Sequence, residues 1–202
     1  MSLKGSNTTS GYIKWDTLIR ITNYLLRKKD YKFYLLIRTG MFTGLRIGDI
    51  LNLKWNDVLE KDYIELTEKK TKKFRRIRVN EELKKDFVMT FKKLSESTLM
   101  SIRIQNQDEY IFSNKYKTNH LSIQYVNTKL KEIVKKYKIN PNYISSHSLR
   151  KSFGRRVWEM NNHSDKSLIL LSELFNHSNI AVTRRYLGIR QSEIFDIYLS
   201  LE

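Results

Sequence analysis

The sequence predicts an α+β fold that is mainly α-helical, with a small three-stranded antiparallel sheet near residues 55–79. Outside that stretch, apolar residues recur at helical spacing over most of the chain. Inside it, short β-prone segments alternate with polar breaks. With 202 residues, of which 40% are hydrophobic and 12% aromatic, the chain can bury a core as one large domain or as a compact domain with a small appendage.

Two helices are predicted before the sheet. Residues 13–28 carry apolar side chains at near-helical spacing, which indicates an amphipathic helix that ends in a basic cluster. Residues 31–43 are apolar on almost every side, which indicates a buried central helix. Gly44 ends this helix, and residues 45–51 form a new helical turn with Arg46 at its start.

The predicted sheet has strands at residues 55–58, 63–66 and 74–79. Polar breaks at residues 60–62 and 69–73 separate these strands, so we expect two hairpin connections. The second connection is rich in lysine.

This second loop begins a strongly basic run. Seven of the ten residues from Lys69 to Arg78 are lysine or arginine. Many such runs are solvated and protect a sheet edge. The density of charge here instead favours a finger laid against phosphates, with contacts from Lys69, Lys72, Lys73, Arg75 and Arg76.

The second half of the chain returns to helical periodicity. Helices are predicted at residues 81–99, 122–137, 147–160 and 191–201. The proline Pro141 closes the second of these helices, and Ser146 is predicted to cap the third. Ser178 or Asn179 can cap a further helical segment that ends near Tyr186, because either side chain accepts hydrogen bonds from free amides.

Composition restricts the partners. The chain has 38 Lys+Arg against 21 Asp+Glu, and the resulting charge of +17 indicates a polyanion, most commonly nucleic acid. No apolar run reaches the length of a membrane span, and residues 1–12 are polar, which is typical of a flexible terminus or of residues added by cloning. The absence of cysteine excludes disulfides, thiolate metal sites and a cysteine nucleophile, and it is consistent with the cytoplasm.

Two motifs offer chemistry, each with a simpler alternative. His147 and Arg150 are spaced i and i+3 in the first turn of a predicted helix, where side chains and amide dipoles favour an anion. The same pattern also fits a surface ion pair. Tyr186 follows Arg184 and Arg185, so it is either a ring packed on a basic surface or a nucleophile directed at a phosphate.

Together these residues match the needs of one reaction. Breaking a phosphodiester with a protein hydroxyl requires a nucleophile, positive charge on the non-bridging oxygens and an acid for the leaving oxygen. Two arginines can hold the phosphate with bidentate hydrogen bonds, and a loop lysine can protonate the leaving oxygen. A histidine can accept the tyrosine proton, because the free phenol has a pKa of about 10. These steps need no metal, and the sequence has no H-E-x-x-H motif or obvious carboxylate cluster, so no metal or other cofactor is expected.

The order of these motifs resembles that of the tyrosine recombinase (phage integrase) family. The motifs are T-G-L-R-I-G-D-I from Thr43, K-T at Lys70, H-S-L-R from His147, L-F-N-H ending at His177, and Tyr186 nine residues later. The resemblance covers roughly residue 13 to the C-terminus and looks like the catalytic domain of integrases from phages, conjugative transposons and genomic islands. It implies the tyrosine recombinase catalytic fold.

The resemblance implies that three residues act on the phosphate and the leaving group and that a fourth supports them. Arg46 and Arg150 would bind the scissile phosphate and stabilise its transition state. Lys70 would be the general acid for the 5′ oxygen. Asp49 would support the site without taking part in the chemistry.

The resemblance also implies the covalent step. His147 would assist proton transfer, and His177 would hydrogen-bond the phosphate. Tyr186 would attack the phosphate to form a 3′-phosphotyrosine link, which a second strand's 5′ hydroxyl reverses without ATP. Arg184 and Arg185 are expected to contact the DNA.

The sequence departs from the family pattern at several positions. Lys151 stands where many members have a histidine, Asn176 where glycine is common, and Asn80 where proline is frequent. Among the loop lysines, Lys70 fits best as the acid because it precedes Thr71, while its neighbours stay alternatives.

The resemblance also sets expectations for domains and partners. Family members normally carry a core-binding domain ahead of this region, so we expect residues 13–202 to be the catalytic domain of a longer integrase. The expected partner is double-stranded DNA at attachment or recombination sites. We expect the protein to be a monomer when free and to form a homotetramer on paired DNA sites, with no membrane involved. The helix at residues 191–201 would pack in cis or on a neighbouring protomer.

Three functions compete. The leading one is a site-specific recombinase that integrates or excises a mobile element. A type IB topoisomerase shares the catalytic logic, but the short length and the motif spacing argue against it. A non-catalytic DNA-binding module on the same fold would not need the complete set of arginines, histidines, lysine and tyrosine.

Overall fold

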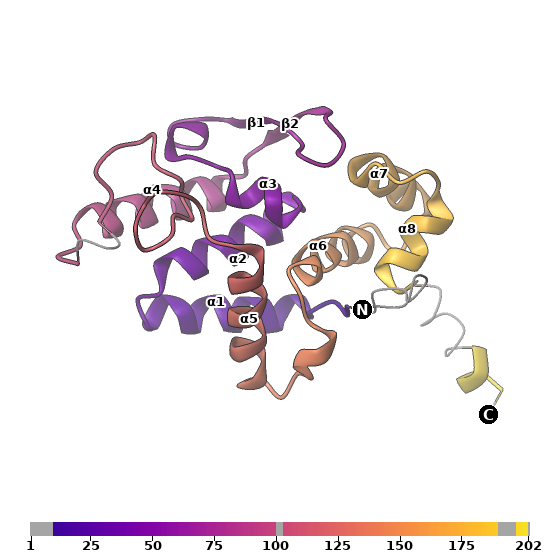
Figure 1. Ribbon diagram of the computed structural model, residues 1–202. Coiled ribbons are helices and arrows are strands. Elements are labelled where there is room, and N and C mark those ends of the chain that lie inside the picture. The colour runs from indigo at the N-terminus through magenta and orange to yellow at the C-terminus, as the bar shows by residue number, and fades with distance from the viewer. Residues whose placement is uncertain (1–9, 100–102, 190–196, 202) are drawn as a thin grey trace.

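Helices form most of the molecule, and one of them is central. The computed structural model describes residues 10–99, 103–189 and 197–201 (Figure 1). Helix α2 (Tyr31–Thr43) packs against α1 (Trp15–Arg27), α4 (Glu81–Ser95) and α6 (His147–Met160). Nearly all its side chains are buried, as its lack of a polar face predicts. The predicted buried central helix is therefore confirmed.

Local interactions define both ends of α2. The side chain of Asp30 caps its N-terminus by accepting a hydrogen bond from the backbone amide of Phe33. Gly44 follows the last turn with φ +58, a left-handed conformation that glycine adopts without strain. The chain turns there into the short helix α3 (Ile47–Leu51), with Arg46 at its N-cap position.

The sheet is smaller than predicted. Within the described ranges it has two antiparallel strands, β1 (Tyr63–Thr67) and β2 (Phe74–Arg78), rather than three. Tyr63 pairs with Arg78 at the open end of this hairpin, and Thr67 pairs with Phe74 next to its loop.

The segment at residues 55–58, predicted as the first strand, begins with a 3-10 helix at Trp55–Asp57. The Asp57 carboxylate closes this turn by accepting a hydrogen bond of 2.7 Å from the Lys54 backbone amide. The Trp55 side chain is fully buried, and its ring lies 5.2 Å from that of Phe91. The prediction was wrong because a buried aromatic residue in a capped turn gives the same apolar–polar pattern as a short strand.

The other described elements are α5 (Ile123–Lys135), the 3-10 helix η2 (Pro141–Tyr143), α7 (Asp165–Phe175) and α8 (Ile180–Leu187). Helix α4 ends at Ser95, four residues before its predicted end. The predicted flexible N-terminus and the predicted last helix lie mostly outside the described residues. No helix in the described part of the chain is long and apolar enough to cross a membrane.

Two predicted caps had different outcomes. Ser146 stands at the N-cap position of α6, but its backbone is already helical and its side chain makes no capping hydrogen bond. The neighbouring Ser145 hydroxyl accepts from the His147 amide at 3.2 Å instead, so the predicted cap was wrong. Asn179 is extended and caps α8 by accepting from the Val182 amide at 3.0 Å, which confirms one of the two predicted alternatives.

Helices α7 and α8 build a small second core beside α6 (Figure 1). Phe175 of α7 and Leu187 of α8 are buried in it. Helix α8 can approach α6 closely because Gly154 lacks a side chain: a Cβ there would lie 2.6 Å from Leu187 Cδ2. The loop of the β1–β2 hairpin reaches toward α7, so the hairpin, the starts of α3 and α6, and the α7–α8 pair meet in one region.

Candidate active site

Arg46 and Arg150 meet at the carboxyl end of α7. The Phe175 carbonyl oxygen accepts a hydrogen bond of 3.2 Å from Nη2 of Arg46 and another of 3.2 Å from Nη2 of Arg150. Nη1 of Arg150 also donates to the Gly44 carbonyl. Carbonyl groups at helix ends have no intrahelical partner, so they are available to these guanidinium groups. Both predicted phosphate-binding arginines therefore point to one place.

Arg150 is the more buried of the two arginines. Its guanidinium lies 4.2 Å from the centre of the Phe175 ring, and the residue is only 3% exposed. Burial lowers the pKa of Arg150 to about 10, so the group keeps its charge at neutral pH. Phe175 thus fixes this arginine from two sides, by its ring and by its carbonyl oxygen.

Glu68 lies next to the arginines and was not among the predicted site residues. Its fully buried carboxylate accepts hydrogen bonds of 2.6 Å from Nη1 of Arg46 and 3.0 Å from Nη1 of Arg75. It also accepts from Thr71 Oγ1 at 2.6 Å and from Asn176 Nδ2 at 3.4 Å. Burial would raise the pKa of Glu68, but the hydrogen bonds hold it at about 2. The one signal in the sequence is an isolated acid directly before a basic run.

Asp49, the predicted supporting residue, holds the start of the hairpin loop. Its Oδ1 accepts a hydrogen bond of 2.9 Å from the backbone amide of Lys69. At the other end of the loop, Nζ of Lys73 donates to Oδ1 of Asn176 at 3.2 Å. The loop is therefore attached to α3 on one side and to the end of α7 on the other.

Lys70 lies between these two attachments and is exposed. Its charge is among those that lower the pKa of His147, after burial and the charges of Arg150 and Lys151. His147 stands in the first turn of α6, one turn before Arg150. The structure therefore brings the predicted acid and the predicted proton-transfer residue into one electrostatic environment.

His177 lies beside Phe175 and Tyr186. Its Nδ1 lies 2.9 Å from Thr183 Oγ1, so Nε2 is the ring nitrogen that can bind a ligand. Burial, together with the charges of Arg150 and Arg46, lowers the pKa of His177 to about 4. The ring is therefore neutral at physiological pH and can donate a hydrogen bond without adding charge.

Tyr186 stands in α8 and faces the same group of residues. Its ring lies 5.1 Å from that of His177 and 5.6 Å from that of Phe175. Its hydroxyl is buried and has no hydrogen-bond partner among the described residues. Burial raises the pKa of Tyr186, whereas the charges of Arg150 and Arg46 act in the opposite direction.

The residues predicted to contact DNA fall into two groups: exposed side chains, and side chains that pair with acidic residues. Lys69, Lys72, Lys73 and Arg185 are exposed. Three arginines have acidic partners: Arg75 with Glu68, Arg76 with Glu65 at 3.0 Å, and Arg184 with Asp165 at 3.5 Å. The side chain of Arg75 is 13% exposed, so it points into the site rather than toward the outer surface of the hairpin.

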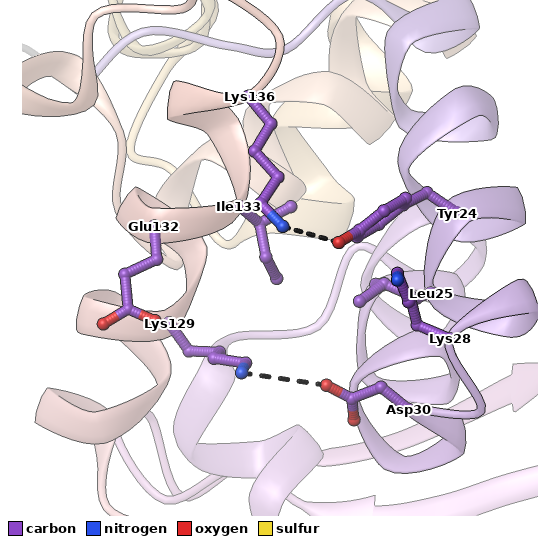
Figure 2. Close-up of a pocket in the computed structure, with 8 residues that line it drawn as sticks. All are labelled: Tyr24, Leu25, Lys28, Asp30, Lys129, Glu132, Ile133 and Lys136. Carbon is purple, nitrogen blue, oxygen red and sulfur yellow. Dashed lines mark hydrogen bonds and ion pairs between the residues drawn. The ribbon is translucent and has the colours of Figure 1, made fainter.

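A separate pocket of about 270 Å³ lies between α1 and α5 (Figure 2). Nζ of Lys136 donates to the Tyr24 hydroxyl across it at 2.5 Å, and Lys129 lies 4.0 Å from Asp30. Its lining comes from these helices and from the turn after α1 rather than from the predicted site residues. The arginines, histidines and tyrosine are therefore grouped elsewhere.

Known proteins are similar to this chain in sequence and in fold. Residues 13–193 match the phage integrase family. The chain is 32% identical over 169 residues to the probable integrase/recombinase YoeC of Bacillus subtilis, covering 84% of this chain and 83% of YoeC. It is 26% identical over 168 residues to the tyrosine recombinase XerH of Campylobacter jejuni, covering 82% of this chain but 44% of XerH.

Solved structures agree on the fold. The crystal structure of XerA recombinase superposes with a TM-score of 0.67 at 22% identity, over 95% of this chain and 65% of XerA. XerH bound to a palindromic difH substrate in a post-cleavage complex gives a TM-score of 0.65 at 20% identity, over 98% of this chain and 55% of XerH. With the family match over residues 13–193, these comparisons show that the chain belongs to the phage integrase family of tyrosine recombinases.

Proposed function

We propose that this protein is a site-specific DNA recombinase that cuts and rejoins DNA strands to integrate or excise a mobile element. The observation that carries the proposal is the convergence of Arg46 and Arg150 on one carbonyl oxygen beside the Tyr186–His177 pair. A phosphate that displaces the Phe175 carbonyl would meet two guanidinium groups, a neutral imidazole and a phenol at once.

Cleavage begins with attack of Tyr186 Oη on the scissile phosphorus. A bond forms between Oη and phosphorus, the bond from phosphorus to the 5′ oxygen breaks, and a 3′-phosphotyrosine remains. Arg46 and Arg150 neutralise the charge on the non-bridging oxygens, and Nε2 of His177 donates a further hydrogen bond. The attack of a 5′ hydroxyl on this link reverses the step and joins the strands, so ATP is not required.

Two proton transfers accompany the attack. The Tyr186 proton must leave, because burial keeps its pKa high. Desolvation and the charges of Arg150 and Lys151 lower the pKa of His147, which favours the neutral imidazole that can take this proton. Lys70 gives a proton to the departing 5′ oxygen, which makes that oxygen a better leaving group.

The partner is double-stranded DNA. The net charge of +17 supports this, as do the exposed lysines around the hairpin loop. XerH and lambda integrase, which share this fold, were solved bound to DNA substrates. We infer that the catalytic domain is monomeric when free and tetrameric on paired sites, and that it acts at the nucleoid in the cytoplasm of a bacterium.

The test separates an enzyme from a DNA-binding module. A duplex that carries the end of the mobile element would be incubated with the wild-type protein and with Tyr186→Phe, and binding and strand cleavage would be measured on the same samples. We expect both proteins to bind with the same salt dependence, and the wild type alone to cut. Binding without cleavage by the wild type would identify a binding module and contradict the proposal.

A further inference from the structure

The loop that carries Lys70 has little apolar packing to hold it. An open cleft of about 200 Å³ separates the hairpin from the end of α7, and the ring of Phe74 beside the loop is 67% exposed. The loop is therefore positioned by polar contacts, and Glu68 makes most of those that reach into the site.

The contacts of Glu68 connect four segments of the chain. Thr71 belongs to the loop, Arg75 to β2, Arg46 to the start of α3 and Asn176 to the end of α7. All four donate to the one carboxylate, at distances of 2.6 to 3.4 Å. The Glu68 backbone also closes the loop, by donating to the Lys73 carbonyl and accepting from the Lys72 amide, each at 2.9 Å.

We propose that Glu68 is a positioning residue for the reaction: it fixes the hairpin loop against Arg46 so that Lys70 is presented to the leaving oxygen. The inference rests on the proposed function. Lys70 lies between Glu68 and Thr71, two residues that are joined side chain to side chain at 2.6 Å. This contact and the Glu68–Arg46 pair at 2.6 Å together set the distance between the acid and the phosphate-binding arginine.

The arrangement requires a carboxylate rather than any polar side chain. Two guanidinium groups, a hydroxyl and an amide all donate hydrogen bonds to Glu68. An ionised carboxylate suits these donors because both of its oxygens accept hydrogen bonds and neither donates. A glutamine at this position would direct its own amide hydrogens at one of these donors. Glu68→Gln should therefore loosen the loop while nearly preserving the volume of the side chain.

The first test measures loop order without DNA. Hydrogen–deuterium exchange of residues 68–73 would be compared in the wild type, Glu68→Gln and Glu65→Gln. Glu65 is a matched control because it lies three residues before Glu68 and also pairs with an arginine, but its side chain is 53% exposed whereas that of Glu68 is fully buried. We expect exchange to rise by about tenfold or more in Glu68→Gln alone. The amides of α2 should stay protected in all three proteins, which shows that the variants are folded.

The second test asks whether the loss acts through the acid. Cleavage would be followed on the duplex that carries the element's end, and on the same duplex with sulfur in place of the bridging 5′ oxygen. The thiolate leaves without a proton, so this substrate does not need Lys70. On the ordinary substrate we expect Glu68→Gln to slow the covalent step by roughly 10²-fold. On the sulfur substrate it should come within about threefold of the wild type, as should Lys70→Ala, which calibrates the assay.

Unchanged loop exchange in Glu68→Gln would overturn the proposal, as would an equal loss of rate on both substrates. A partial return of rate in Glu68→Asp, which keeps the charge on a shorter side chain, would support it. Failure of the proposed function would give a different result, because the wild type would then cut neither substrate. The exchange comparison would still decide whether Glu68 fixes the loop.

Discussion

The rings of His177 and Tyr186 are in edge-to-face contact, with their centres 5.1 Å apart and their planes at 70°. The turn between α7 and α8 produces this contact, because Asn176 ends α7 in a left-handed conformation and Asn179 starts α8 three residues later. Thr183, one turn into α8, holds the imidazole at Nδ1. The proposed nucleophile and the proposed phosphate-binding histidine are thus presented by one compact helical hairpin.

Acid should destabilise the protein partly through His177. Its pKa in the folded chain is about 4, below the ordinary value of 6.5. Between these values the unfolded chain binds a proton and the folded chain does not, so the free energy of unfolding falls as the pH drops from 6.5 to about 4. The slope from this residue is at most about 1.4 kcal/mol per pH unit. Urea unfolding of His177→Asn should show a shallower pH dependence of the free energy of unfolding than the wild type. Identical slopes for the two proteins would contradict the assignment.

Gly44→Ala should lower the free energy of unfolding by about 2–4 kcal/mol. Its φ of +58 disfavours a side chain, and the new Cβ would lie 2.4 Å from Phe153 Cδ1. Gly48→Ala is the matched control, since nothing lies within 4 Å of its added Cβ. That change should leave stability within about 1 kcal/mol or increase it, because alanine favours a helix. Equal thermal unfolding of the two variants would count against the described turn.

Arg46→Lys and Arg150→Lys should each slow cleavage by roughly 10²–10³-fold, because lysine keeps the charge but cannot form the bidentate contact. Arg20→Lys, on α1 and hydrogen-bonded to Thr17, is the control. Single-turnover rates at saturating DNA would separate this loss from weaker binding. Wild-type rates in both site variants would rule out the two-arginine phosphate site.

Lys70→Ala should slow the covalent step by about 10²–10⁴-fold, as expected for the loss of a general acid. Lys72→Ala should instead preserve the rate at saturating DNA and reduce the salt dependence of binding by the equivalent of about one phosphate contact. The comparison uses neighbouring lysines of one loop, so general damage to the hairpin would affect both. A larger rate loss in Lys72→Ala would reassign the acid.

Much of the helical framework was predictable from local signals. The bounds of α2 and α6 follow from hydrophobic spacing together with the stop at Gly44 and the breaks that flank α6. Residues 55–58 were mispredicted because the alternation of a buried tryptophan with polar neighbours does not distinguish a strand from a turn closed by Asp57. The chemistry of the Ser146 cap was missed because it depends on a backbone angle that the residue type does not determine.

The spacing of His147 and Arg150 predicts that both lie in the first turn of one helix, and the structure places them there in α6. Glu68 was not predictable, because its donors come from four separate segments and its burial depends on their assembly. Arg75 illustrates the same limit: it belongs to a basic run in the sequence, yet in the folded chain it turns inward to Glu68. Local pattern indicates which side chains are charged, but only packing decides which way they face.

The most direct measurement is the identity of the residue that becomes joined to DNA. A nicked duplex with the element's end would be incubated with the wild type and with Tyr186→Phe in the presence of EDTA, and the linked peptide would be mapped by mass spectrometry after digestion. We predict a 3′-phosphate bound to Tyr186 in the wild type and no linked peptide in the phenylalanine variant. A link to another residue, or a link that persists in the variant, would contradict the proposal that Tyr186 is the nucleophile.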